Sequence, residues 1–110
     1  MPNNFKRKFS RSIGVANTQI GTYAVPVSTQ TTVIGLTVAN IIGNPINVSV
    51  RHNDGSANTH LVKDAPVPVG GSLVVVGGDQ KLVLEAGDSV YVSSNTATSV
   101  DAVMSILEIT

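Results

Sequence analysis

Two histidines flank the most polar stretch of the chain, and imidazole is a common metal ligand and proton carrier at neutral pH. His52 and His60 enclose Asn53 and Asp54, so two imidazoles and a carboxylate could hold a metal ion. Their spacing matches no compact ligand motif, and the sequence indicates no third strong ligand. Asp54 is followed by a glycine, which is a strong turn signal. We therefore interpret residues 51–60 as an exposed loop or hairpin tip, and we predict no metal site.

Aspartate–glycine pairs and glycine pairs could also serve binding. Asp54, Asp79 and Asp88 each lie beside glycine, as the ligands of calcium loops often do. None belongs to an alternating Asp/Asn series that ends in glutamate, so we interpret them as turn residues. The glycine pairs at 70–71 and 77–78 lack the spacing of phosphate-binding loops, and no helix is predicted after them. The sequence predicts no cofactor.

Catalytic sets are not visible either. A serine or threonine nucleophile needs a base, and both histidines fall in one predicted loop, so a triad has few ways to form. Most of the seven acids lie at turns, where nothing suggests the paired carboxylates of a glycosidase. Cysteine is absent, which removes thiolate nucleophiles, disulfides and cysteine-bound zinc. We therefore predict no catalytic residues and no enzyme.

Basic and aromatic side chains alternate near the start of the chain, and this is the most distinctive functional signal. Residues 1–12 carry four basic residues and no acid, whereas residues 13–110 carry three basic residues against seven acids. The segment could bind nucleic acid, form a solvated tail, or reach an acidic neighbouring subunit. The candidate protein-contact arm consists of Phe5, Lys6, Arg7, Lys8, Phe9 and Arg11.

The pattern along the chain is strand, turn, strand, without a sustained apolar stripe at helical spacing. Alternation is clearest in residues 31–40, where Ile34, Leu36 and Val38 are predicted to face the core. Residues 100–109 are apolar on both faces, which indicates a strand that is central in its sheet or covered by a neighbour. Other strands are expected in residues 13–27 (one or two bent edge strands), 46–50, 61–63, 72–76, 81–85 and 89–93, with turns at 44–45, 77–79 and 86–88 and a polar loop at 94–99.

The spacing of these strands predicts the fold class. Prolines 66 and 68 make residues 65–71 an extended connector outside any central ladder position. About eight short strands predict an all-β, single-domain antiparallel β-sandwich, jelly-roll-like, over residues 13–110, preceded by a basic N-terminal arm of residues 1–12. The arm is too polar for a signal peptide, and no run reaches the ~20 apolar residues of a membrane helix. We therefore expect a soluble protein, made in the cytoplasm, with no membrane partner.

Several runs resemble small virion proteins of tailed phages, particularly marine and cyanobacterial ones. They are YAVP (23–26), TTVIGLTVAN (31–40), LVKDAPVP (61–68), GSLV (71–74), LEAGDSV (84–90) and SILEI (105–109). The resemblance covers nearly the whole chain and rests on strand and turn sequences rather than on chemistry. It implies a β-sandwich structural subunit of the virion, such as a capsid decoration (cement) protein or a neck or tail component.

Composition is consistent with this expectation. Charged residues make up 13% of the chain and cancel formally, so much of the surface must be Ser, Thr, Asn, Gln and Gly, which suits contact with other protein. We expect a non-enzymatic homo-oligomer in the virion, made in the host cytoplasm, with other virion proteins as partners, above all the major capsid protein. Nucleic acid is not the expected partner. The alternatives are a neck or tail subunit, or a host-surface module that binds glycan or metal through residues 51–60. Removal of residues 1–12 is expected to leave folding intact and to weaken assembly.

Overall fold

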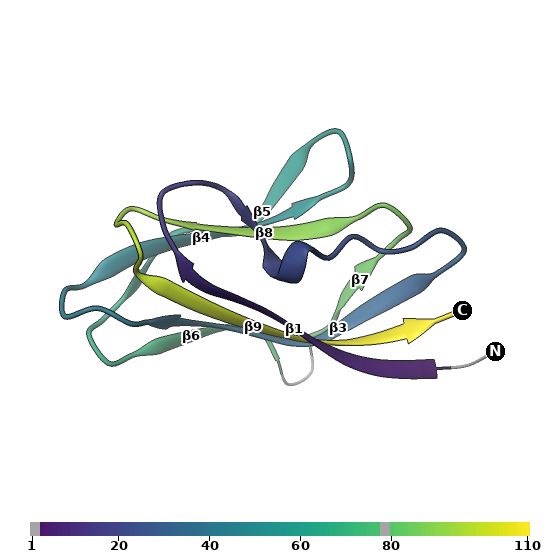
Figure 1. Cartoon of the computed structure of the whole chain (residues 1–110), viewed down its shortest axis with the longest axis horizontal. Coiled ribbons are helices and arrows are strands. Elements are labelled where there is room, and N and C mark those ends of the chain that lie inside the picture. Colours follow the sequence, from purple (N-terminus) through teal and green to yellow (C-terminus); the bar gives the residue numbers. More distant parts are fainter. Residues whose placement is uncertain (1–2, 78–79) are drawn as a thin grey trace.

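Two antiparallel sheets pack face to face in a computed structural model that describes residues 3–77 and 80–110 (Figure 1). The larger sheet has the order β1 (Asn3–Ile13), β9 (Val100–Ile109), β3 (Gln30–Asn40), β6 (Ser72–Val76), and β7 (Leu82–Leu84) also pairs with β3. The smaller sheet has the order β2 (Thr18–Gln19), β8 (Ser89–Ser94), β4 (Ile46–Asn53), β5 (Asn58–Val67). A single 3-10 turn, η1 (Ile20–Thr22), follows β2. Within the described ranges, no helix is long and apolar enough to cross a lipid bilayer.

The strand order is that of a jelly roll. β6 pairs with residues 36–39 of β3 and β7 with residues 31–33, so the two short strands act as one interrupted strand. Counted in this way, the sandwich has four strands on four, the double-sheet arrangement of jelly rolls. The predicted all-β, antiparallel, single-domain sandwich is confirmed.

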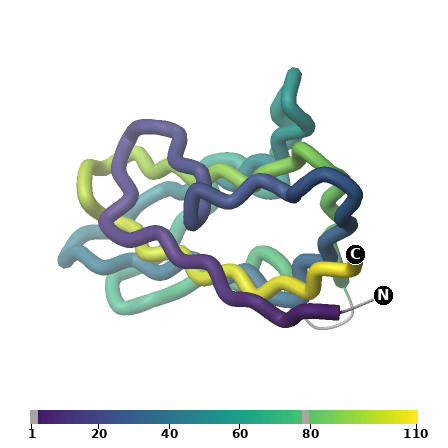
Figure 2. Tube along the Cα trace, turned by 45° about the vertical axis from the view of Figure 1, so that its right-hand side comes forward, coloured from purple at the N-terminus to yellow at the C-terminus, as the bar shows by residue number. Residues whose placement is uncertain are grey.

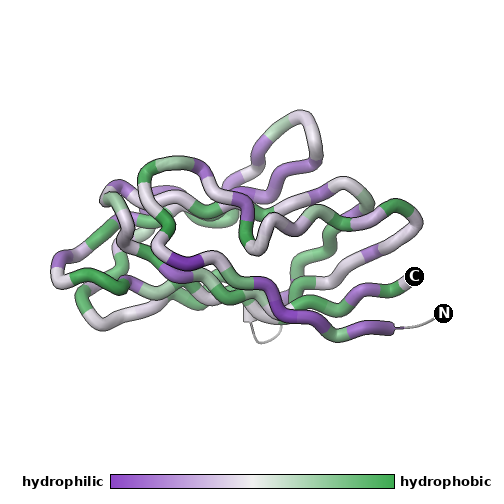
Figure 3. Tube along the Cα trace, in the orientation of Figure 1, coloured by the Kyte–Doolittle hydropathy of each residue, from purple (hydrophilic) through white to green (hydrophobic). Residues whose placement is uncertain are grey.

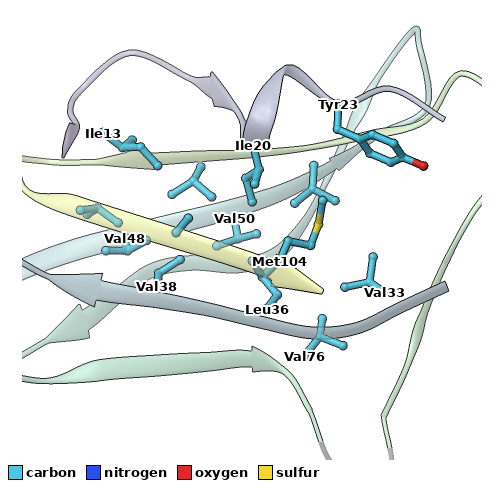
Figure 4. Close-up of a cluster of buried hydrophobic side chains, with 14 of the residues drawn as sticks. Ile13, Ile20, Tyr23, Val33, Leu36, Val38, Val48, Val50, Val76 and Met104 are labelled. Atoms are coloured by element: carbon cyan, nitrogen blue, oxygen red, sulfur yellow. The ribbon is translucent and has the colours of Figure 1, made fainter. Parts of the chain in front are cut away.

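The core is aliphatic and lies between the two sheets (Figure 4). β9 contributes Ala102, Met104 and Ile106 to it, each at most 1% exposed, while Val103 points outward. β4 supplies alternate valines from the opposite sheet, among them Val48 and Val50. β9 lies between β1 and β3, which confirms that its two apolar faces reflect a central position.

The prediction for β3 is wrong at one residue. Val33 pairs with Ile106 and Gly35 pairs with Ser105, so Ile34 is an extra residue in β3 and forms a bulge. A bulge shifts the alternation by one, and Val33, not Ile34, is therefore fully buried, while Leu36 and Val38 face the core as predicted. Ile34 is turned to the outer face.

The polar stretch at 51–60 forms the hairpin between β4 and β5, which projects from the sandwich (Figure 1). Asp54 closes its tip because its Oδ1 accepts the backbone N–H groups of Ser56 and Ala57 at 3.0 and 2.8 Å. These hydrogen bonds favour the carboxylate and lower the pKa of Asp54. The expected hairpin tip is confirmed, although the flanking residues belong to the strands.

The remaining local predictions have mixed outcomes. The predicted connector at 65–71 is in part the end of β5, where Pro66 lies opposite Asn47 on an edge strand. The 13–27 segment contains the last residue of β1, the two residues of β2, and η1. The turn at 86–88 is confirmed by the hydrogen bond from Asp88 N–H to the carbonyl of Glu85. The predicted turn at 77–79 falls mostly outside the described residues.

Candidate assembly interface

The basic N-terminal segment lies in strand β1 from Asn3 onward, along the edge of the larger sheet (Figure 2). β1 pairs with β9 from Asn3 opposite Ile109 to Ile13 opposite Val100, with a register shift after Ser10. Residues 3–12 therefore belong to the same sheet as β9 and β3. Figure 3 shows this strand as one of the most hydrophilic in the molecule.

The strand alternation divides the predicted arm residues into two sets. Lys6 and Lys8 lie opposite Ile106 and Met104, whose side chains face the core. Phe5, Arg7 and Phe9 lie opposite the outward-facing residues Leu107, Ser105 and Val103. Since successive side chains of a strand point to opposite faces, Arg11 continues the outward set.

The inward set is bound to the sandwich by a network around Glu108. Its carboxylate is only 4% exposed, accepts the Tyr23 hydroxyl at 2.6 Å and pairs with Lys6 Nζ at 2.9 Å. The Tyr23 hydroxyl also lies 2.8 Å from the hydroxyl of Thr31. Lys8 Nζ lies 5.1 Å from the centre of the Tyr23 ring, a cation–π distance. The network fastens β1 to β9, β3 and the segment that follows η1.

The pKa values of Glu108 and Tyr23 shift in opposite directions from their ordinary values. Hydrogen bonds from Tyr23 and Lys6 lower the pKa of Glu108, because both stabilise the carboxylate. Burial, followed by the hydrogen bond to Glu108, raises the pKa of Tyr23 to about 12. Glu108 therefore stays ionised and Tyr23 protonated at neutral pH, the states in which they hydrogen-bond. Such a pair holds structure and offers no proton donor or acceptor near neutrality.

The outward set belongs to an apolar surface that crosses the larger sheet, which we call the outer face. One row of aligned residues runs Phe5, Leu107, Thr32, Val83 across β1, β9, β3 and β7. A second row runs Phe9, Val103, Thr37, Val74 across β1, β9, β3 and β6. The exposed fractions reach 75% for Phe5, 63% for Val74 and 60% for Val83.

Between these rows the side chains are small. Ser105 and Gly35 are paired there, and a Cβ added to Gly35 would meet no atom within 4 Å. A hollow of about 330 Å³ opens in this region, lined by Phe5, Lys6, Arg7, Ile34, Ser105 and Ile106. The outer face thus contains a shallow groove with apolar walls and with Arg7 at its β1 end.

Arg7 and Arg11 stack on Phe9 in the outer face. Each guanidinium carbon lies 5.4 Å from the centre of the Phe9 ring. Within the described part of the chain, neither arginine makes an ion pair, whereas Lys6 pairs with Glu108. The outer face therefore presents two unneutralised guanidinium groups beside an apolar groove.

The opposite surface of the sandwich, the outside of the smaller sheet, is polar. Arg51 donates from Nη1 to Asn17 Oδ1 at 2.8 Å and to Ser93 Oγ at 2.9 Å. Five of the large exposed hydrophobic residues in the described ranges belong to strands, and all five lie in the larger sheet: Phe5, Phe9, Val74, Val83 and Val103. The others are in loops: Val15, Val27, Ile41 and Val69.

The two histidines are not brought together. His60 lies opposite Arg51 and His52 opposite Thr59, so the imidazoles point to opposite faces of the β4–β5 hairpin. His52 Nε2 instead lies 2.8 Å from Asp88 Oδ2, which also accepts the N–H of Glu85. Among the residues that the structure describes, no group of three or more potential metal ligands is found. The His52–Asp88 pair links β4 to the turn before β8.

The Glu108 network and the outer face were not predicted from the sequence. Glu108 shares a strand face with Ala102, Met104 and Ile106, and an acid at the end of an apolar set was a signal for a buried, paired carboxylate. Tyr23 is far from it in sequence, so its partnership depends on the fold. The outer face depends on the pairing of β1 with β9, which the sequence did not indicate.

Comparisons with known proteins inform the fold. No protein-family model matches the sequence, and no curated protein matches it. A solved structure of a subunit from the disulfide-linked pili of Bacillus endospore appendages is similar, with a TM-score of 0.55 and 14% sequence identity. The match covers 99% of this chain and 87% of that one. This similarity shows a shared β-sandwich fold, and the resemblance to phage virion proteins stays a prediction.

Proposed function

We propose that this chain is a non-enzymatic structural subunit of a multi-subunit particle, and more specifically a capsid decoration protein of a tailed phage. In this proposal the chain is made in the host cytoplasm and docks on the shell built by the major capsid protein. The observation that carries the proposal is the concentration of exposed apolar side chains on one face of one sheet. Contiguous apolar surface of this kind is typical of protein-interaction sites.

The contrast between the two sheets supports docking through one side. An antiparallel sheet that faces water alternates apolar inward with polar outward residues. The smaller sheet follows this rule, with Arg51 and Ser93 on its outside, whereas the larger sheet exposes Phe5, Val74 and Val103. A one-sided apolar face suits a subunit that lies on a larger assembly.

The pilus-subunit similarity favours a second candidate, a subunit that polymerises with its own copies. This chain contains no cysteine, so a filament of it would need non-covalent contacts, unlike the disulfide-linked pili. Electron microscopy of the purified chain tests this candidate directly. Filaments formed by the chain alone would favour it over decoration.

Quantitative mass spectrometry of particles from the source virus tests the first candidate. A copy number close to that of the major capsid protein is expected for a decoration protein. A low, fixed copy number would instead indicate a neck or tail ring, whose size is set by symmetry. Absence from the particles would overturn the virion proposal.

A further inference from the structure

We propose that the outer face recognises a protein surface of a different sequence that combines apolar side chains with carboxylates. Arg7 and Arg11 would each pair with a carboxylate, and the groove over Ser105 and Gly35 would receive an apolar side chain. This inference rests on the proposed function in one respect, which is that the chain docks through this face. It goes further by specifying which side chains the partner's surface must present.

The positions of the guanidinium groups define the first requirement. Arg7 and Arg11 flank the Phe9 ring at 5.4 Å on one exposed strand face. Docking of an apolar surface would remove water from both groups, which is costly unless an anion pairs with them. A guanidinium offers a planar fork of donors that fits a carboxylate with two hydrogen bonds. The stacking on Phe9 restrains each fork before the partner arrives.

The groove defines the second requirement. Its lining includes Ser105 and the apolar residues Phe5 and Ile34, and Gly35, which pairs with Ser105, adds no side chain beside it. The charged residues that line the groove, Lys6 and Arg7, both belong to β1, and the side chain of Lys6 is paired with Glu108. An apolar side chain would fill the hollow and bury its walls, which is favourable in proportion to the area removed from water.

Nucleic acid fits this face less well than protein does. Of the four basic residues in the segment, Lys6 pairs with Glu108 and Lys8 lies over Tyr23. Two guanidinium groups then remain for phosphates, whereas nucleic-acid binding usually engages many cations along a track. The apolar rows have no role in contacting a phosphate backbone.

A second copy of the chain also fits less well. Asp101, a carboxylate on the outward side of β9, already accepts the N–H of Ser12 at 2.9 Å, which makes it a poorer partner for an arginine of a second copy. The outside of the smaller sheet carries Arg51, which is also positive. Asp54 lies at the tip of the β4–β5 hairpin, and Glu85 directly follows β7, across the larger sheet from β1. We therefore assign the complementary surface to another protein, and self-association is one of the outcomes that would overturn the inference.

The three arginines of the chain provide an internal control, because Arg51 lies on the other sheet. The experiment follows the Nε–Hε NMR signals of Arg7, Arg11 and Arg51 during titration with a soluble peptide of alternating leucine and glutamate. Saturable shifts are expected at Arg7 and Arg11 and not at Arg51. A leucine–glutamine peptide is expected to bind at least about tenfold more weakly, because charge-assisted hydrogen bonds are lost.

Two double variants each remove two positive charges, one from the outer face and the other from the smaller sheet. R7Q/R11Q is expected to weaken binding of the leucine–glutamate peptide by at least about tenfold, whereas R51Q/K63Q is expected to retain it. Thermal melts of both variants check that each is folded. Equal weakening in the two variants would show general electrostatic attraction and would overturn the inference.

Other results would also overturn it. These are equal shifts at Arg51, equal affinity for the leucine–glutamine peptide, tighter binding of a single-stranded oligonucleotide, or shifts at Arg7 that depend on the chain's own concentration. The proposed function is tested separately by the copy number in particles. If the chain is present in particles but its arginines do not bind the acidic peptide, only the inference is refuted. If its arginines bind the peptide but the chain is absent from particles, only the virion assignment is refuted.

Discussion

Glu108 is the buried residue through which side chains link the N-terminal strand to the rest of the sandwich. It is an almost fully buried carboxylate, 4% exposed, and its charge is balanced by Lys6 and by the hydroxyl of Tyr23. A buried charge that loses one of its partners keeps its desolvation cost, so each partner matters more than its own hydrogen bond. Predictions at this scale concern the Glu108 network.

The Tyr23→Phe substitution is expected to lower the free energy of unfolding by about 1–3 kcal/mol, because it removes a hydrogen bond to a buried carboxylate. Urea denaturation measures this change. Tyr91→Phe is the matched control, since the Tyr91 hydroxyl makes no hydrogen bond in the described part of the structure, and little change is expected there. Equal losses in both variants would show that Tyr23 contributes through packing and not through Glu108.

Stability is expected to fall in acid through Glu108. Its pKa is lower in the folded chain than in the unfolded chain, so the unfolded state binds more protons as the pH falls below the ordinary value of about 4.5. The contribution is fully present above that pH and is lost as the pH falls through the folded pKa. Urea midpoints measured between neutral pH and strong acid should fall less steeply for Glu108→Gln than for the wild type. Identical slopes would contradict this role.

At the scale of elements, β1 is an edge strand that the adjacent 3-10 turn holds in place. Ser10 Oγ accepts the N–H of Gly21 at 2.8 Å and lies 3.3 Å from the carbonyl of Gln19. Gly21 has a φ of 59°, and a Cβ on it would lie 2.9 Å from Cβ of Lys8. The close approach of η1 to β1 therefore requires glycine at this position.

Gly21→Ala is expected to destabilise the fold by about 1 kcal/mol or more, because alanine strains a left-handed backbone and presses on β1. Gly43→Ala is the matched control, since Gly43 has no positive φ and no atom within 4 Å of an added Cβ. Thermal melting of the two variants checks this. A Gly43 variant as unstable as the Gly21 variant would argue against a specific β1 contact.

The sequence predicted the sandwich from alternation and turn signals, and it failed where these signals were absent. β1 lacks the usual apolar inward set, because Lys6 and Lys8 face Glu108 and Tyr23 instead of a hydrophobic core. Ile34 was placed in the core because uninterrupted alternation gives no sign of a bulge. The outer face depends on alignment of four strands across the sheet, and strand order is not encoded in local spacing. The hairpin tip at Asp54, by contrast, was predicted from local turn chemistry.

The stability of β1 changes the expectation for truncation. Residues 1–12 include most of β1, so their removal would leave the β1 side of β9 unpaired and Glu108 without Lys6. We expect such a truncated chain to melt at a lower temperature than the full chain and to expose a new sheet edge to association. A truncated chain with unchanged melting temperature would show that β1 adds little to the fold. The role of Phe5, Lys6, Arg7, Lys8, Phe9 and Arg11 as a contact arm stays a prediction, best tested by substitution within an intact β1.

At the scale of the whole molecule, the sandwich has one polar side and one apolar side. The polar side carries Arg51 and Ser93 in internal hydrogen bonds, and the apolar side carries the outer face. Near-zero net charge offers little electrostatic protection against association, so a molecule of this kind is suited to a bound state. The central claim is that the outer face holds the chain in its assembly.

For the proposed virion role, the most direct measurement compares the incorporation of two triple variants into phage particles by quantitative mass spectrometry. V74T/V83T/V103T makes the outer face polar, and V15T/V27T/V69T changes three exposed valines in loops in the same way. Both should fold, because each substitution is isosteric and on the surface. The account predicts that the outer-face variant is strongly depleted from particles while the loop variant is retained at the wild-type level. Equal incorporation of the two variants would contradict it.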